Sequence, residues 1–237
     1  MISPLSTVTL FHIGPAPVSQ AVVTTWAIMA LLVGGGVLLS RMLKPAPSRL
    51  QAFFELIVGT LDDEIRSTMQ AEPGPYRAFI GTIFMFIFVA NWSTLIPGVS
   101  PPTARLETDA ALALLVFLAV IGFGIRSGGI GGYLKTFASP NPLMIPLNLV
   151  ESVTRAFSMF VRLFGNVMSG VFVIGIVLML AGLLVPIPLM ALDLLTGAVQ
   201  AYIFAVLAMV FISSGLPKAK SLPAPTEGPS HTKGTSP

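Results

Sequence analysis

The stretch SMFVRLFGNVMSG, residues 158–170, lies inside a long apolar segment and carries a single arginine, Arg162, near its middle. The apolar residues Phe160, Leu163 and Val167 recur at helical spacing, which predicts a helix with an apolar face. A guanidinium at the centre of a bilayer costs about 2.5 to 3.5 kcal/mol, and it keeps its proton. We expect a membrane helix that retains such a residue to use its charge.

The composition of the chain is that of an integral membrane protein. Of its 237 residues, 54% are hydrophobic and 10% are charged, whereas soluble domains carry about 25% charged residues. The net charge is +3, but the basic residues are scattered along the chain, which argues against a nucleic-acid-binding face. Because the chain has no cysteine and only two histidines, we expect neither a metal site nor a cofactor.

The sequence predicts an all-α membrane protein with five hydrophobic membrane helices and one amphipathic interfacial helix. The interfacial helix contains Asp62, Asp63 and Glu64 in a row, a charge density that would not cross lipid. The last two helices are separated by Val-Pro-Ile-Pro at 185–188, and each is too long for one perpendicular crossing, so we expect a tilted hairpin. The predicted helices cover about residues 21–43, 47–69 (interfacial), 76–96, 109–125, 143–184 and 189–214.

The chain is expected to form one membrane domain, residues 21–216, between two shorter segments. Residues 1–20 would lie outside, because Arg41 and other basic residues follow the first span and mark the cytoplasmic side. Residues 217–237 are rich in Pro, Ser, Thr, Gly and Lys, which predicts a disordered cytoplasmic tail. The absence of an internal repeat argues against an inverted-repeat transporter.

Polar residues share one face on each of the last two predicted helices. On the last helix, Asp193, Thr196 and Gln200 lie three and seven residues apart. Two such faces would border a hydrated path, and a fixed cation beside it would favour the ionised form of a passing carboxylate, so that the carboxylate releases its proton or Na⁺. On the 143–184 helix the polar face consists of Glu151, Arg155, Ser158, Arg162, Asn166 and Ser169.

Simpler interpretations of these residues stay open at this point. Arg162 could form a structural salt bridge with Asp193 across the hairpin. Glu151 and Arg155 are four residues apart and could form an intrahelical ion pair. Taken singly, Asn166, Ser158, Ser169 and Thr196 could simply hold helices together by hydrogen bonds.

At these residues the sequence resembles subunit a of the rotary F-type ATP synthase, and the resemblance covers nearly the whole chain. The strongest motif is Arg162-Leu163-Phe164-Gly165-Asn166 followed by Gly170, which is the essential-arginine signature of the family. Further matches occur in order at Asn91, Leu95-Ile96-Pro97-Gly98, Pro102-Thr103, Ala111-Leu112-Ala113-Leu114, Pro146-Leu147-Asn148 with Glu151, and Gln200-Ala201-Tyr202-Ile203-Phe204.

The resemblance implies a stator subunit of the bacterial Fo sector, in the cell inner membrane. Such a subunit provides two aqueous half-channels that pass H⁺ or Na⁺ to and from carboxylates of the c-ring, and it binds no nucleotide, no cofactor and no nucleic acid. Its implied partners are the c-ring, the b subunits of the peripheral stalk and the lipid bilayer. Arg162 would face the c-ring carboxylate, with Asn166 and Gln200 beside it at the inner end of the outer half-channel. Glu151 and Ser169, on the same polar face as Arg162, are further candidates for ion translocation.

The sequence departs from the family pattern at the outer side of this path. Many members carry a glutamate after the motif glycine, where this chain has Val171, and an acid two residues after Pro-Thr, where it has Arg105. We therefore expect Asp193, Asp109 and Glu107 to line the outer half-channel. This relocation of acids resembles the secondary, sodium-type branch of bacterial F-ATPases.

Two other functions compete with this interpretation. In the first, the chain is an autonomous secondary transporter in which Arg162 binds an anionic substrate. In the second, it is a structural membrane anchor with Arg162 in a buried salt bridge. Neither explains the ordered set of motifs. The choice between H⁺ and Na⁺ lies outside this sequence, because it depends largely on the carboxylate site of the partner ring.

Overall fold

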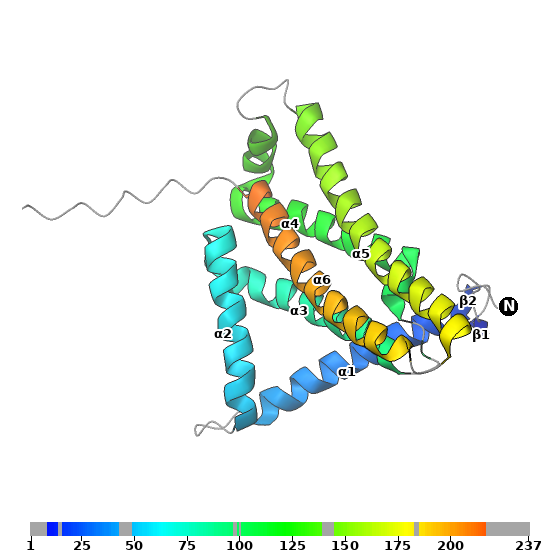
Figure 1. Ribbon diagram of the computed structural model, residues 1–237. Helices are drawn as coiled ribbons and strands as arrows, with labels where there is room; N and C mark the ends of the chain where they lie inside the picture. Colours follow the sequence, from blue (N-terminus) through cyan, green and yellow to red (C-terminus); the bar gives the residue numbers. More distant parts are fainter. Residues whose placement is uncertain are drawn as a thin grey trace, which may run out of the picture.

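A computed structural model gives the architecture of the chain, and it describes residues 9–13, 16–42, 49–96, 99, 101–138, 145–182 and 185–216. Five helices are long and apolar enough to cross a membrane, and α2 is the exception among the six α-helices. The prediction of an all-α membrane protein is therefore confirmed. The elements are β1 (Thr9–Ile13), β2 (Ala16–Ser19), α1 (Gln20–Met42), α2 (Arg49–Met69), α3 (Gly74–Trp92), the 3₁₀ turns η1 (Ser93–Leu95) and η2 (Pro102–Ala104), α4 (Leu106–Ala138), α5 (Ile145–Ala181) and α6 (Pro186–Gly215) (Figure 1).

Two features differ from the sequence prediction. The strands β1 and β2 form a short antiparallel hairpin before α1, within the segment predicted only as an outer-side segment. Helix α4 begins at Leu106 and continues to Ala138, past the predicted end at residue 125. Its glycine cluster interrupts the helix at Gly129, where φ is 69° and ψ is 171°. Glycine takes this conformation without steric cost, so α4 continues after a kink. The predicted disordered tail, residues 217–237, lies outside the described residues.

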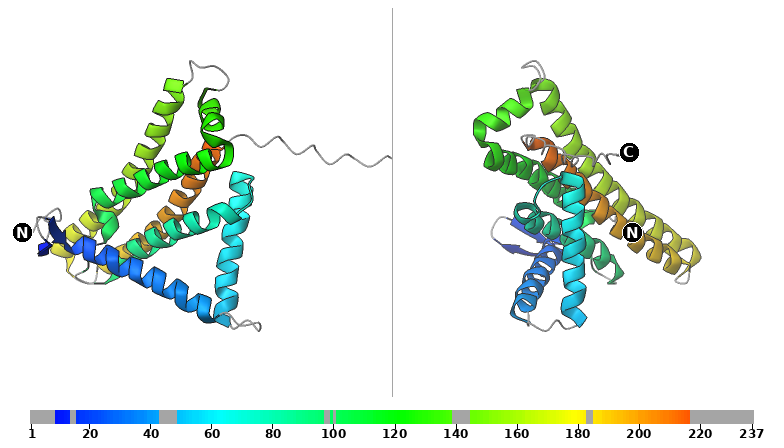
Figure 2. Two further views of the ribbon diagram at one scale, coloured as in Figure 1. Left: turned by 180° about the vertical axis from the view of Figure 1, so that it is seen from behind. Right: turned by 90° about the vertical axis from the view of Figure 1, so that its left-hand side faces the viewer.

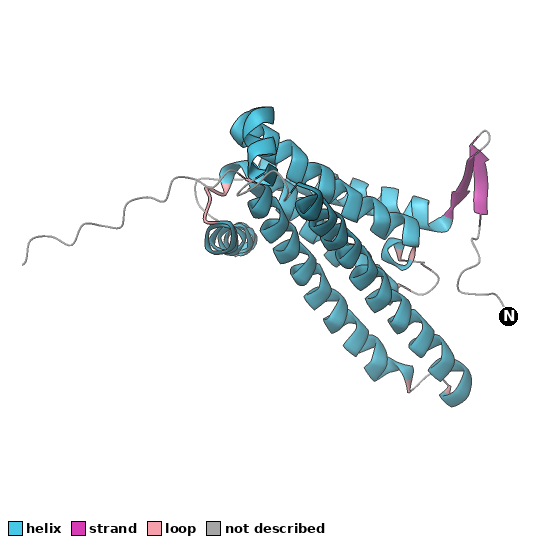
Figure 3. Ribbon diagram, turned by 90° about the horizontal axis from the view of Figure 1, so that it is seen from above, coloured by secondary structure: helices cyan, strands magenta, loops and turns pink. Residues whose placement is uncertain are grey.

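Helices α5 and α6 form the long antiparallel hairpin expected from the sequence. Helix α5 ends at Gly182, which adopts the left-handed φ of 72° that commonly terminates helices. Helix α6 starts with Pro186 in its first turn, a position where proline costs no hydrogen bond. With 37 and 30 residues, the helices are about 55 and 45 Å long, longer than the hydrocarbon core of about 30 Å. The pair extends past the other helices in Figures 2 and 3.

Helix α2 runs across the direction of α3 in two views (Figures 1 and 2). Its C-terminal half belongs to the core, because Ile65 and Met69 are buried, whereas Leu56 and Val58 in its N-terminal half are exposed. The apolar side chains of α2 are thus buried near its C-terminus and exposed near its N-terminus. This placement fits the predicted interfacial helix.

The core is formed by α3, α4, α6, the end of α2 and one face of α5. Small buried residues follow one side of α6, namely Gly197, Ala201, Ala205 and Ala208. Lipid is as apolar as these side chains, so helices in a membrane associate by close packing rather than by the hydrophobic effect. The small residues let α3 and α4 approach the backbone of α6, and the larger side chains of Ile80, Ile87, Val116, Leu163, Phe204, Met209 and Ile212 fill the remaining space.

Candidate functional site

Arg162 lies on the open side of α5. The opposite side of the helix carries Met159, Leu163 and Val167, each at most 4% exposed, and packs into the core. Arg162 itself is exposed, and it forms no ion pair with any residue that the structure describes. The salt bridge with Asp193, which was one interpretation of the sequence, is therefore not formed.

Beside the polar face that contains Arg162, the exposed surface of α5 is apolar. Val153, Phe157 and Val161 are exposed on the N-terminal side of Arg162, and Phe172 and Ile176 are exposed on its C-terminal side. These side chains suit lipid or another apolar helix, but the guanidinium does not. An apolar helix from outside this chain that carries a carboxylate would suit both parts of the surface.

The remaining polar residues of α5 have different surroundings. The Ser169 hydroxyl donates to the backbone oxygen of Asn166 at 2.9 Å, and both residues lie on the Arg162 side of the helix. Glu151 and Arg155 form an exposed ion pair, so the interpretation of these two residues as an intrahelical pair is confirmed.

Asp193 on α6 is packed against Gly170 on α5. A methyl group added at Gly170 would lie 2.0 Å from Asp193 Oδ1, closer than any real contact. The carboxyl group is half-buried between the two helices, and it forms no ion pair within the described part of the chain. Gly170 thus leaves room for the carboxyl group of Asp193.

A cavity of about 320 Å³ opens beside this contact. It lies between the η1–η2 connection and the α5–α6 hairpin, and Asp193 and Arg105 are its charged lining residues. Val171, which replaces the glutamate common in the resembled family, lines it as well. The other lining residues are Thr94, Leu95, Val99, Pro101, Ala104, Met168, Ile174, Gly175, Met190 and Leu194.

Gln200 and Asp109 are buried polar residues in the helix bundle. Gln200 is 6% exposed and its Nε2 atom has no hydrogen-bond partner in the structure. Asp109, in the first turn of α4, is 0% exposed and neither of its carboxyl oxygens has a partner. Unpaired buried polar groups are costly and often mark a function or a water site. Glu107 is exposed and does not line the cavity.

Comparison with known proteins gives the family. Residues 22–213 match the family described as ATP synthase A chain. The chain belongs to this family. It is 50% identical over 214 residues to a protein of Bradyrhizobium sp. named ATP synthase subunit a 2, covering 90% of this chain and 96% of that protein. It is 46% identical over 209 residues to ATP synthase subunit a 1 of Chlorobaculum parvum, covering 87% and 92%. The protein named ATP synthase subunit a from Albidiferax ferrireducens is 42% identical over 211 residues, covering 88% and 91%.

One polar network of this ATP synthase A chain member was not among the predicted site residues. The Asn91 Nδ2 atom donates to the backbone oxygen of Gly197 at 2.8 Å, and the Thr103 hydroxyl donates to Asn91 Oδ1 at 2.7 Å. All three residues are buried, so the network joins α3, η2 and α6 inside the bundle. An asparagine within an apolar span is the sequence signal that indicates such a network.

No metal centre is formed by the described part of this family member. Within those residues there is no group of three or more His, Asp or Glu side chains that could hold a metal ion. Together, the five candidate spans and the family membership make the chain a multi-pass membrane protein. The polar residues in and beside these spans are its candidate functional residues.

Proposed function

We propose that this chain is the stator subunit a of a rotary F-type ATP synthase and that Arg162 separates two aqueous half-channels for H⁺ or Na⁺. The observation that carries the proposal is the position of Arg162, an exposed guanidinium beside apolar side chains of α5, with no ion pair among the described residues. A lone charge of this kind in a membrane needs a partner outside the chain. A carboxylate of a rotating c-ring has the required charge and would pass this face.

In this mechanism the c-ring carboxylate reaches Arg162 with its ion bound. The positive field favours the ionised carboxylate, so the ion leaves into one half-channel. The ring moves on, and the carboxylate receives another ion from the other half-channel. Arginine suits this role better than lysine, because a guanidinium remains charged in an apolar setting. Asn166 and Gln200 supply amide groups beside this passage.

The outer half-channel would lead through the cavity that Asp193 lines, with Glu107 nearer the surface and Asp109 within the bundle. Ser169 would lie between Arg162 and this cavity. Glu151, on the N-terminal part of α5, would belong to the cytoplasmic side. We assign the chain to the bacterial inner membrane with its N-terminus outside. Its partners would be the c-ring and the b subunits, and the chain itself would perform no covalent chemistry and bind no nucleotide.

The proposal is tested by replacing Arg162 in the complete ATP synthase complex. Arg162→Gln and Arg162→Ala should abolish ion-driven ATP synthesis while the complex still assembles, because the side chain is exposed and makes no ion pair within the described part of the chain. Synthesis is measured in liposomes, and assembly by the recovery of all subunits. Arg126→Gln, at an exposed arginine of α4, is the matched control. Coupled synthesis by the Arg162 variants would overturn the proposal.

A further inference from the structure

The cavity beside the α5–α6 hairpin contains two side chains of opposite charge, Arg105 and Asp193. Most of its remaining wall is apolar, with residues such as Met168, Val171 and Ile174. A fixed charge acts more strongly in a setting of low polarity than in bulk water. These two side chains therefore dominate the electrostatic potential inside the cavity.

The backbone of Arg105 is held at the junction of η2 and α4. Its amide donates to the Pro102 carbonyl at 3.0 Å, and its own carbonyl accepts from the amides of Thr108 and Asp109 at 3.1 and 3.2 Å. The first residue of α4 directly follows Arg105. The base of the side chain is thus fixed on the cavity wall.

The charge of Arg105 is not neutralised by the chain itself. Arg66, Arg77 and Arg155 each form an ion pair with an acid, whereas Arg105 has no such partner among the described residues. Of the nearby acids, Glu107 is exposed outside the cavity lining, and the buried oxygens of Asp109 have no hydrogen-bond partner. The guanidinium therefore acts on whatever occupies the cavity.

A cavity that passes cations has two conflicting requirements. It must bind the ion well enough to be filled, and weakly enough to release it. Asp193 alone in an apolar wall would attract a cation and retain it. A guanidinium in the same wall repels the cation, and it cannot lose its charge. A cavity with both groups holds the ion more weakly than one with the acid alone.

We propose that Arg105 is a specificity-determining residue of the outer cavity and that it weakens the binding of the transported monovalent cation, H⁺ or Na⁺, beside Asp193. This inference rests on the proposed outer half-channel. The charge at position 105 then sets the concentration at which the outer side of the stator is half-saturated. The arginine thus has an electrostatic role that differs from that of Arg162.

The test uses the complete ATP synthase in liposomes whose lumen corresponds to the outer side. The initial rate of ATP synthesis is measured against lumenal H⁺ in one series and lumenal Na⁺ in another, at a constant membrane potential. The series that shows saturation identifies the ion. The variants are Arg105→Lys, Arg105→Gln and Arg105→Glu. Arg126→Gln, at an exposed arginine of α4 outside the cavity, is the control for loss of one positive charge.

The half-saturating concentration should follow the charge at position 105. Arg105→Gln should lower it about tenfold, at the lower end of the effect that charged clefts have on local ion concentration, and Arg105→Glu should lower it further. Arg105→Lys should stay near the wild-type value. The differences should shrink in concentrated choline chloride, since the screening length falls from about 10 Å at 0.1 M to about 3 Å at 1 M.

Equal half-saturating concentrations for the Lys, Gln and Glu variants would overturn the inference. If Arg105 had only a structural role, its variants would lower assembly or the maximum rate, and the half-saturating concentration would not follow the charge at position 105. If Arg105→Gln does not assemble, Thr94→Asp adds an acid to the same cavity wall and should shift the concentration in the same direction. Asp193→Asn distinguishes failure of the proposed half-channel from failure of the proposed role of Arg105. Normal synthesis by that variant would contradict the proposed half-channel itself, whereas its loss with no shift at Arg105 would contradict this inference alone.

Discussion

Gly170 and Asp193 form a contact that leaves no room for a side chain at position 170. The signature of the family contains this glycine, and the structure gives it a steric reason, because a methyl group there would overlap Asp193 Oδ1. Asp193 lies on the short stretch of α6 that also carries Thr196 and Gln200. A change at Gly170 therefore acts on Asp193 and, through it, on the proposed ion path.

Gly170→Ala should lower ion-driven ATP synthesis by about tenfold to a hundredfold, the effect that a displacement of about 1 Å has on an aligned site. The carboxyl group must move, or α5 and α6 must separate, to accept the methyl group. The control is Gly122→Ala on α4, where an added methyl group has no neighbour within 4 Å. Both variants are assayed in assembled complexes. A wild-type rate for Gly170→Ala would show that the position of Asp193 does not matter.

Asp109 combines complete burial with two carboxyl oxygens that lack hydrogen-bond partners. Such a group destabilises a folded protein by about 1 to 3 kcal/mol. A residue that lowers stability and is nevertheless present is a candidate for a functional role. Both Asp109 and Glu107 were predicted to line the outer half-channel. In the structure Asp109 is buried and Glu107 is exposed.

Asp109→Leu should raise the thermal unfolding midpoint of the solubilised complex and lower its rate of ion-driven synthesis. Leucine has a similar volume and removes the unpaired oxygens, while it also removes an ionisable group of the proposed path. Glu107→Leu, at the exposed acid, serves as the comparison for loss of one charge. A lower midpoint for Asp109→Leu would mean that the carboxyl group is stabilised by a partner such as bound water.

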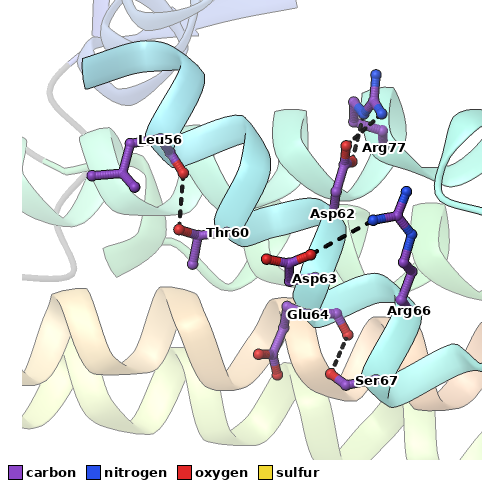
Figure 4. Close-up of polar contacts among 8 residues, drawn as sticks. All are labelled: Leu56, Thr60, Asp62, Asp63, Glu64, Arg66, Ser67 and Arg77. Atoms are coloured by element: carbon purple, nitrogen blue, oxygen red, sulfur yellow. Dashed lines mark hydrogen bonds and ion pairs between the residues drawn. The ribbon is translucent and has the colours of Figure 1, made fainter. Parts of the chain in front are cut away.

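Helix α2 carries three consecutive acids, and two of them make polar contacts to other helices of the bundle. Asp62 pairs with Arg77 of α3, and Asp63 pairs with Arg66 within α2, as Figure 4 shows. The third acid, Glu64, accepts a hydrogen bond from the Tyr202 hydroxyl of α6 at 3.0 Å. The acidic run that makes α2 too charged to cross a membrane therefore also holds α2 against α3 and α6.

Tyr202→Phe should loosen α2 from α6. It removes one hydrogen bond, worth about 1 kcal/mol, which corresponds to about fivefold faster amide exchange in the C-terminal half of α2 if this half opens locally. Hydrogen exchange by mass spectrometry measures this change. Glu64→Gln retains an oxygen that can accept the bond and is the matched control. Equal exchange rates in the wild type and Tyr202→Phe would contradict an anchoring role for this bond.

The helices were predictable because each has a pattern that is local in the sequence. The apolar spans, the acids of α2 and the proline-containing break between the last two helices are all of this kind. Helix α4 continues past the predicted end at residue 125, because Gly129 is the one residue between Leu106 and Ala138 that departs from helical geometry. The cavity was not predictable, since Arg105 and Asp193 come together only when the η1–η2 connection packs on the hairpin.

At the scale of the whole molecule, the α5–α6 hairpin and α1 present different surfaces. The hairpin exposes the Arg162 face, and α1 lies on another side of the bundle (Figure 2). Both surfaces are largely apolar, with Phe157 on α5 and Leu31 on α1 among the exposed side chains. Among the described residues, the first carries an arginine without an ion pair inside its span, Arg162, whereas the arginine of α1, Arg41, lies in the last turn of that helix. The proposed function requires that the c-ring contact this first surface.

Cysteine cross-linking tests this arrangement directly, because the chain contains no cysteine of its own. In a complex with one cysteine beside the c-ring carboxylate, Phe157→Cys should form a disulfide with the c subunit under mild oxidation. Leu31→Cys should not, although Leu31 is 64% exposed and Phe157 62%. Exposure is thus matched, and position alone distinguishes the two variants. The products are measured on non-reducing gels. Cross-linking through Leu31→Cys alone would place the c-ring against α1 and contradict the proposed arrangement. An autonomous transporter, which has no c subunit beside it, would give neither product.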